Sequence, residues 1–321
     1  MDNVLSGNQE KDLLEHVINE AERFISGKRE QIKLALVALL AGGHLLLNDV
    51  PGVAKTRLAR VLAGLIGMSF ARIQGTPDLL PSDVTGGLIY EPQSGQLSFR
   101  PGPIFHHVIL FDEINRATPR TQAALLEAME ERQVTDSGQS HPVPSPFIVL
   151  ATQNPIEMEG TFPLPEAQMD RFLLSFGLGY PDLQDERELV RRFSHADQVK
   201  DIVAIWNPGQ VTQLMKRVAD VRLDDAVLAY LVDVVRATRQ HPMIRLGASP
   251  RAAVQYARAV RAHAYVAGRD FVTPDDVQAL AVPLLAHRMV MGAEASVSGS
   301  TSAEVVSSLL NTVPVPVEDV R

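Results

Sequence analysis

Residues 48–56 and 108–113 carry the side chains of this chain that are best suited to chemistry. The first segment reads Asn-Asp-Val-Pro-Gly-Val-Ala-Lys-Thr and follows an apolar run. The second is the apolar run Val-Ile-Leu-Phe, which ends in the carboxylates Asp112 and Glu113. A loop of the first kind binds phosphate, and a carboxylate pair after a strand can hold a metal ion and activate water. Together the two segments predict hydrolysis of a nucleoside triphosphate.

The phosphate-binding prediction depends on the place of the loop between a strand and a helix. His44 to Leu47 is a short apolar run, and Thr56 to Ile66 has apolar residues at helical spacing. A helix N-terminus offers phosphate free N–H groups and the positive end of its dipole. We expect Lys55 to reach the β- and γ-phosphates of ATP and the Thr56 hydroxyl to bind Mg²⁺. The predicted nucleotide-binding residues are Val50, Pro51, Gly52, Val53, Ala54, Lys55, Thr56 and Arg57.

This loop departs from the pattern G-x-x-x-x-G-K-[ST] at both outer glycines. Asp49 stands at the first glycine position and Ala54 at the second, while Gly52 is retained. If position 54 needs a left-handed backbone, alanine there costs about 1–2 kcal/mol. The departures leave open a chance turn, or a scaffold that binds nucleotide without hydrolysing it. The intact carboxylate pair at 112–113 argues against both alternatives.

The carboxylates and a nearby amide predict the catalytic side of the site. We expect Asp112 to hold magnesium through water and Glu113 to polarise the attacking water as a general base. A third apolar run, 147–152, is followed by Gln153 and Asn154. Ligands of open α/β sheets bind at the carboxyl ends of the strands, where Asn154 could orient water or contact the γ-phosphate. The alternative is that Asn154 only opens the turn before Pro155.

Longer segments of the chain resemble the MoxR family of AAA+ ATPases. They begin at residues 112, 124, 151, 166 and 247, and read DEINRA, ALLEAMEE, ATQNP, EAQMDRF and GASPRA. The resemblance extends from about Phe24 to about Pro316. It implies an α/β fold, an AAA+ P-loop NTPase with a five-stranded parallel sheet flanked by helices and a C-terminal all-α lid domain. It also implies that the sensor 1 strand separates the Walker A and Walker B strands.

The resemblance assigns roles to several residues. Lys55 and Thr56 match Walker A, and Asp112 and Glu113 match Walker B. Asn154 matches sensor 1, Arg251 matches sensor 2 on the domain that closes over the nucleotide, and Arg171 matches the arginine finger that reaches the ATP of a neighbouring subunit. An arginine supplied in trans can be worth about 10³–10⁵ in rate. Alternatively, Arg171 pairs with a nearby carboxylate and Arg251 is a cation on a helix surface. Arg116 is a weaker candidate for a second contact between subunits.

The apolar patterns predict two domains, at 1–181 and 182–321. Strands are expected near 44–48, 69–74, 107–112, 147–152 and 173–177, and their alternation with helices predicts a parallel sheet. Residues 86–103 and 133–146 predict two hairpins, and the resemblance implies that the first is the insert in helix 2. Both hairpins could line a central pore, face a client protein or be plain solvent loops.

The second domain is predicted to be helical, with helices at 182–194, 211–218, 224–240, 249–267 and 275–291. Ser249 and Pro250 predict a helix start that places Arg251 in the first turn. Thr273 and Asp276 predict a capping box. Residues 294–302, rich in Ala, Ser and Gly, are expected to be mobile.

Composition limits the classes of function. The 321 residues include no Cys and carry a net charge of −8, which argues against a general nucleic-acid binder. No apolar run approaches the ~20 residues that span a bilayer. The start of the chain has no basic region followed by an apolar stretch, so we expect no secretory signal and a cytoplasmic location.

The leading hypothesis is a ring-forming ATPase that hydrolyses ATP at subunit interfaces and uses it for chaperone-like remodelling, assembly or activation of partner proteins. By resemblance, the partners are further copies of the chain in a ring, expected to be a hexamer, and a protein with a von Willebrand factor A domain. One alternative is the AAA+ subunit of a metal chelatase. Another is a nucleic-acid motor, although hairpin 133–146 contains no Lys or Arg for a DNA track.

Overall fold

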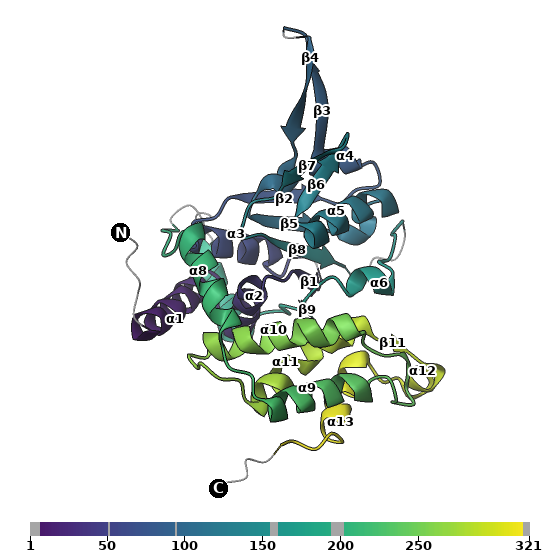
Figure 1. Ribbon diagram of the computed structural model, residues 1–321. Coiled ribbons are helices and arrows are strands. Elements are labelled where there is room, and N and C mark those ends of the chain that lie inside the picture. The colour runs from purple at the N-terminus through teal and green to yellow at the C-terminus, as the bar shows by residue number, and fades with distance from the viewer. Residues whose placement is uncertain (1–6, 51, 94, 155–159, 194–201, 317–321) are drawn as a thin grey trace. The chain divides into compact units, whose positions relative to one another are not determined.

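The computed structural model describes residues 7–50, 52–93, 95–154, 160–193 and 202–316 (Figure 1). Contacts divide the chain into two compact units, each built from separate segments. The first, which we call the sheet unit, comprises Met1–Ala35, His44–Pro163 and Phe176–Gln213. The second, the helical unit, comprises Leu36–Gly43, Leu164–Ser175 and Leu214–Arg321. The predicted division at residue 181 stays a prediction.

A five-stranded sheet with the order β2-β5-β8-β1-β9 is the centre of the fold. Its strands are β1 (Leu45–Asn48), β2 (Phe70–Gln74), β5 (Val108–Asp112), β8 (Ile148–Gln153) and β9 (Leu174–Phe176). The pairs β2·β5, β5·β8 and β8·β1 are parallel. The predicted parallel sheet is confirmed, and so is the position of the sensor 1 strand, β8, between the strands that precede the two Walker motifs.

The central strands are buried on both faces, which explains their continuous apolar sequences. Every residue of 108–111 and of 148–151 is 0% exposed. Parallel strands need such runs because helices cover both faces of the sheet. The sheet unit contains the helices α1 (Gly7–Phe24), α3 (Lys55–Leu65), α4 (Pro81–Thr85), α5 (Pro119–Glu131) and α7 (Leu183–Phe193), and the short 3₁₀ helices at Pro103–Phe105 and Ile114–Arg116. Helix α1 packs on α3.

Both predicted hairpins are present. The first pairs β3 (Gly86–Glu91) with β4 (Gln96–Pro101), and the second pairs β6 (Gln133–Asp136) with β7 (Gln139–Pro142). The rings of Phe99 and His141 stack with centroids 3.8 Å apart, so the base of the first hairpin rests on the second. The distal part of the first hairpin projects from the sheet unit (Figure 1) and exposes Tyr90 and Leu97.

The helical unit contains α6 (Glu166–Met169), α9 (Asp225–Ala237), α10 (Pro250–Val266), α11 (Pro274–Leu285), α12 (Ala293–Ser298), α13 (Ser302–Leu310), a 3₁₀ helix at Ala286–Arg288 and a ribbon of β10 (Ile244–Leu246) with β11 (Val290–Met291). Helices α2 (Arg29–Leu40) and α8 (Pro208–Ala219) contain residues of both units. In the described part of the chain, no helix has the length and apolarity needed to cross a membrane.

The predicted helix starts are confirmed. The Ser249 hydroxyl accepts from the N–H of Ala252, and Thr273 forms a capping box with Asp276. Helix α12 occupies Ala293–Ser298 and overlaps the segment 294–302, whose expected mobility stays a prediction. Glu294 in its first turn suits the positive end of the helix dipole, and Gly299 ends the helix in a left-handed conformation at φ 70°.

Candidate active site

The segments that sequence patterns single out for chemistry follow neighbouring strands of the sheet unit. In the register of the sheet, Leu47 of β1 lies beside Thr152 of β8, and Ala151 lies beside Phe111 of β5. The loop after β1, the carboxylates at the end of β5 and the amides after β8 therefore share the carboxyl edge of the sheet, where open α/β sheets bind ligands.

Asp49, at the first glycine position of the loop pattern, has a structural role. Its side chain is buried, and one carboxylate oxygen accepts from the N–H groups of Leu178, at 2.5 Å, and Gly179, at 2.8 Å. The other oxygen accepts from the N–H of Val50 at 3.1 Å. The carboxylate thus fastens the start of the loop to the chain that follows β9, which a glycine could not do.

Ala54, at the second glycine position, adopts the left-handed backbone that a glycine would take more easily. Its φ is 63° and its ψ is 20°, and it is the N-cap residue of α3. Gly52, which is retained from the pattern, has a φ of 87°. The strain anticipated from the sequence is therefore present at Ala54. Pro51 lies outside the described residues.

Lys55 begins α3 and turns toward the loop that precedes it. Its Nζ donates to the carbonyl oxygens of Asp49, at 2.9 Å, and Val50, at 3.3 Å. Thr56 and Arg57 follow in the first turn of the helix, and Val53 of the loop is buried. An ammonium group, a hydroxyl and a helix N-terminus are thereby gathered at the end of β1.

Asp112 is held by two neighbouring strands. One carboxylate oxygen accepts from the Thr152 hydroxyl at 2.7 Å. The other accepts from Nη2 of Arg72, on β2, at 2.6 Å. The Thr152 hydroxyl also accepts from the backbone N–H of Glu113 at 2.8 Å, so one buried side chain of β8 bonds to the Asp112 carboxylate and to the Glu113 backbone.

Glu113 lies at a sharp turn of the backbone, with a φ of 57°. Its Oε2 accepts from Nε2 of Gln74, at 3.0 Å, and from Nη1 of Arg116, at 3.2 Å. The chain after β2 passes so close that a Cβ on Gly75 would come within 2.2 Å of the Glu113 carbonyl oxygen. Arg116, considered above as a contact between subunits, thus bonds to the carboxylate of its own chain, and the intersubunit role stays a prediction.

Asn154 follows β8 and is 5% exposed. It lies at the same edge of the sheet as Asp112, where its amide can contact a phosphate or a water molecule. Among the described residues, no group of three or more His, Cys, Asp or Glu side chains could hold a metal ion by itself. Mg²⁺ is usually bound through one or two carboxylates and completes its shell with water and substrate phosphates.

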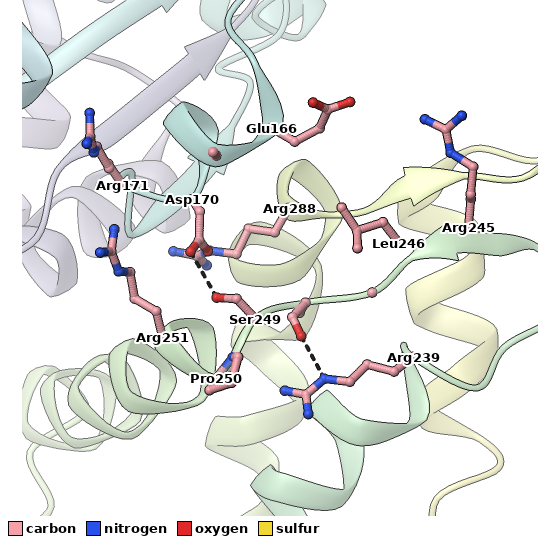
Figure 2. A pocket seen from close by; sticks show the side chains of 13 residues that line it. Glu166, Asp170, Arg171, Arg239, Arg245, Leu246, Ser249, Pro250, Arg251 and Arg288 are labelled. Atoms are coloured by element: carbon pink, nitrogen blue, oxygen red, sulfur yellow. Dashed lines mark hydrogen bonds and ion pairs between the residues drawn. The ribbon is translucent and has the colours of Figure 1, made fainter. Parts of the chain in front are cut away.

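The other two predicted catalytic residues, Arg171 and Arg251, line one pocket of the helical unit (Figure 2), with a volume of about 860 Å³. Five arginines and two acids line this pocket, which we call the arginine pocket: Arg171, Arg239, Arg245, Arg251, Arg288, Glu166 and Asp170. Nε of Arg239 donates to the Ala248 carbonyl at 2.8 Å, which supports the backbone just before Ser249. The excess of arginine makes the pocket suited to an anion, although the chain as a whole carries −8.

Several residues of the site were not foreseen from the sequence. Arg72, Gln74 and Thr152 contact Asp112 or Glu113. Arg72 and Gln74 belong to no short motif, and Thr152 lies in the segment ATQNP without a role having been predicted for it. The available signal was positional, because polar side chains near the carboxyl ends of β2 and β8 must lie beside those of β5. Arg288, buried at the base of the arginine pocket, gave no such signal.

Known proteins match this arrangement over nearly the whole chain. The family described as "ATPase family associated with various cellular activities (AAA)" matches residues 44–174, and the AAA lid domain matches 236–309. Protein MoxR of Methylorubrum extorquens is 31% identical, over 92% of this chain and 93% of its own. Chaperone MoxR1 of Mycobacterium tuberculosis is 41% identical, over 94% of this chain and 82% of its own. The chain belongs to the MoxR family of AAA+ ATPases.

Two further proteins are similar to this chain over nearly its whole length. The Bacillus subtilis protein YeaC is 45% identical, over 95% of this chain and 96% of its own. A crystal structure from Cytophaga hutchinsonii has a TM-score of 0.90 at 36% identity, and the match covers 97% of each chain. The MoxR family assignment and the AAA+ fold predicted from the motifs are therefore confirmed.

Proposed function

We propose that this chain hydrolyses ATP with Mg²⁺ at interfaces between subunits of a ring, and uses the energy for chaperone-like remodelling, assembly or activation of partner proteins. The observation that carries the proposal is the carboxyl edge of the sheet, where the Lys55 loop, the Asp112–Glu113 pair and Asn154 follow three adjacent strands. We expect the protein to act in the cytoplasm, where ATP is available.

The residues present fit ATP and Mg²⁺. Lys55 would exchange its two bonds to loop carbonyls for bonds to the β- and γ-phosphates, helped by the N–H groups at the start of α3. Thr56 and Asp112 would hold Mg²⁺, which neutralises charge on the phosphates when bound. The Thr152 and Arg72 bonds keep the Asp112 carboxylate oriented toward that position.

Glu113 would act as the general base. Its carboxylate oxygen, held by Gln74 and Arg116, must be free to accept a proton from the attacking water. Asn154 would orient the same water molecule. Release of Glu113 from Gln74 and Arg116 would therefore accompany turnover.

Arg171 and Arg251 would neutralise the charge that develops on the phosphoryl oxygens. Because they line one pocket within one unit, we infer that both arginines of a protomer serve the same ATP. If Arg171 reaches the nucleotide of a neighbouring subunit, Arg251 does so too. Hydrolysis then depends on assembly, for which we propose a homo-oligomeric ring, expected to be a hexamer.

The remodelling role rests on relatives and on one surface. A protein of Mycobacterium tuberculosis that is 41% identical is named a chaperone. The β3–β4 hairpin exposes Leu88, Tyr90 and Leu97, and exposed apolar clusters commonly mark contacts between proteins. We propose a protein partner, of which one with a von Willebrand factor A domain is the candidate implied by the family.

The test of the proposed function combines hydrolysis with assembly. The specific ATPase rate is measured against protein concentration, with mass by light scattering in the presence and absence of ATP. We expect a specific rate that climbs with concentration as ATP-dependent assemblies form, and no hydrolysis by Glu113→Gln. A monomer whose specific rate is constant would overturn the interface-shared site, and hydrolysis that survives Glu113→Gln would overturn the role of Glu113.

A mixing experiment tests the arginine finger. Arg171→Ala keeps its own Glu113 but supplies no finger, whereas Glu113→Gln supplies a finger but no base. Each variant alone should be inactive, and a mixture should regain activity at interfaces that combine an intact base with an intact finger. A mixture with no regained activity would count against a site shared between subunits.

A further inference from the structure

The most buried charge of the arginine pocket belongs to Arg288, whose side chain is 1% exposed. Its guanidinium reaches three parts of the helical unit. Nη2 donates to the Phe172 carbonyl at 2.6 Å, and Nη1 donates to the Leu173 carbonyl at 3.2 Å. Further bonds join it to the Leu284 carbonyl of α11 and the Gln255 side chain of α10. Burial lowers the pKa of Arg288 to about 10. Because this pKa is still well above neutral pH, the guanidinium stays charged there.

Asp170 joins this buried arginine to the start of α10. One carboxylate oxygen accepts from Nε of Arg288 at 3.0 Å, and the other accepts from the Ser249 hydroxyl at 2.9 Å (Figure 2). Ser249 is also the N-cap of α10, since its hydroxyl accepts from the N–H of Ala252 at 3.2 Å. The Asp170 carboxylate therefore links Arg288 to Ser249, the N-cap residue of the helix α10 that carries Arg251.

This network of bonds joins the two chain segments that carry Arg171 and Arg251. Arg171 directly follows Asp170, and Arg251 lies two residues after Ser249. The backbone segments that carry Arg171 and Arg251 are thus joined through the carboxylate of Asp170. Arg288 holds that carboxylate on one side and the Phe172 and Leu173 carbonyls on the other.

We propose that Arg288 is a positioning residue that, through Asp170, locks the loop carrying Arg171 to the first turn of α10, so that Arg171 and Arg251 act as one rigid pair. The inference rests on the proposed function of those two arginines. Arg288 lines the pocket with a buried side chain and acts through Arg171 and Arg251. Preorganised charges stabilise a transition state because they need no reorganisation during the reaction, and a misplacement of about 1 Å can cost about 10²-fold in rate.

The test compares Arg288→Met with a matched control, Arg269→Met. Arg269 also bonds a buried carboxylate of the helical unit, that of Asp276, but it does not line the pocket. We expect both variants to melt at lower temperature. Below both melting transitions, Arg288→Met should lower kcat at least tenfold with KM for ATP within about twofold of wild type, and Arg269→Met should keep both constants. Mixing Arg288→Met with Glu113→Gln should restore hydrolysis, because the defect lies in the pair that is supplied to a neighbour.

Three outcomes have distinct meanings. A folded Arg288→Met protein with wild-type kcat would overturn the positioning role, provided that Arg171→Ala is inactive. A loss of kcat that is matched by Arg269→Met, or that Glu113→Gln fails to complement, would also overturn it, because a general structural defect explains both. If Arg171→Ala itself hydrolyses ATP at the wild-type rate, the proposed function of the finger fails instead.

A milder variant covers the case in which Arg288→Met does not fold. Asp170→Asn keeps the size of the side chain and leaves the bonds of Arg288 to backbone carbonyls in place. It weakens only the charged bridge between Arg288 and Ser249. We expect a severalfold lower kcat, an unchanged KM and complementation by Glu113→Gln, and a wild-type kcat in this variant would overturn the proposal.

Discussion

The Thr152 hydroxyl donates to the Asp112 carboxylate at 2.7 Å and accepts from the Glu113 N–H at 2.8 Å. A single buried hydroxyl on β8 therefore bonds to the Asp112 side chain and to the Glu113 backbone at the end of β5. Outer contacts of this kind orient metal-binding side chains, and their loss typically costs about 10–100-fold in metal affinity or activity.

Thr152→Val should remove this control with little change in shape. The Glu113 N–H would lose its buried acceptor, so we expect the free energy of unfolding to fall by about 1–3 kcal/mol. By analogy with outer contacts at metal sites, kcat should fall by about 10–100-fold. The control is Thr152→Ser, which keeps the hydroxyl and should retain most of the activity. Steady-state ATPase assays and urea denaturation would measure both effects, and wild-type kcat in Thr152→Val would refute the role of the hydroxyl.

Asp49→Gly, which restores the usual loop pattern, should weaken this protein. The substitution removes the acceptor for the N–H groups of Val50, Leu178 and Gly179. Unpaired buried donors cost about 1–3 kcal/mol each, and partial hydration leads us to expect a total loss of about 2–4 kcal/mol. Asp49→Asn keeps one oxygen acceptor and should lose less. Urea denaturation would decide, and an Asp49→Gly protein as stable as wild type would show that the three bonds contribute nothing.

The sequence identified the elements of the site better than the contacts between them. Strands, hairpins and helix caps were predictable because their signals are local, such as the apolar run 108–111 or the Ser249-Pro250 helix start. The contacts of Arg72, Gln74 and Thr152 with Asp112 and Glu113 join residues on different strands, about 40 positions apart. They follow only once the order β2-β5-β8 is known.

Ala54→Gly should stabilise the sheet unit. The left-handed conformation at φ 63° costs alanine about 1–2 kcal/mol, and glycine avoids this cost. Glycine also makes the unfolded chain more flexible, which offsets part of the gain. We expect a net gain of about 0.5–1 kcal/mol in the free energy of unfolding. The matched control is Ala59→Gly in the interior of α3, where the backbone is helical and glycine should cost about 1 kcal/mol or more. Equal losses in both variants would mean that Ala54 is not strained.

Residues that act over long sequence separations were the hardest to predict. Arg288 is 118 positions from Asp170, and no periodicity or motif links them. From the sequence alone, Arg288 reads as one more basic residue near a helix end. Its role follows from burial, since a guanidinium that is 1% exposed must find partners for its donors within the fold.

His287 makes the stability of the helical unit sensitive to acid. Its Nε2 donates to the Phe172 carbonyl at 3.0 Å, and burial, together with the adjacent Arg288, lowers the pKa of His287 to about 3. The folded protein therefore keeps this imidazole neutral, whereas the unfolded chain binds a proton near pH 6.5. A depressed pKa gives stability that is complete above about pH 6.5 and is lost as the pH falls toward 3. The loss from this residue should reach about 2 kcal/mol at pH 5.

His287→Gln tests this assignment, because glutamine does not titrate and its amide can still donate to Phe172. The free energy of unfolding is measured by urea denaturation at pH 8 and at pH 5 for wild type and variant. We expect the difference between the two proteins to shift by about 2 kcal/mol in favour of the variant at the lower pH. The control is His16→Gln, a replacement of the same type on the exposed face of α1. A His287→Gln protein that follows the pH dependence of wild type would mean that His287 gains its proton in the folded state as easily as in the unfolded chain.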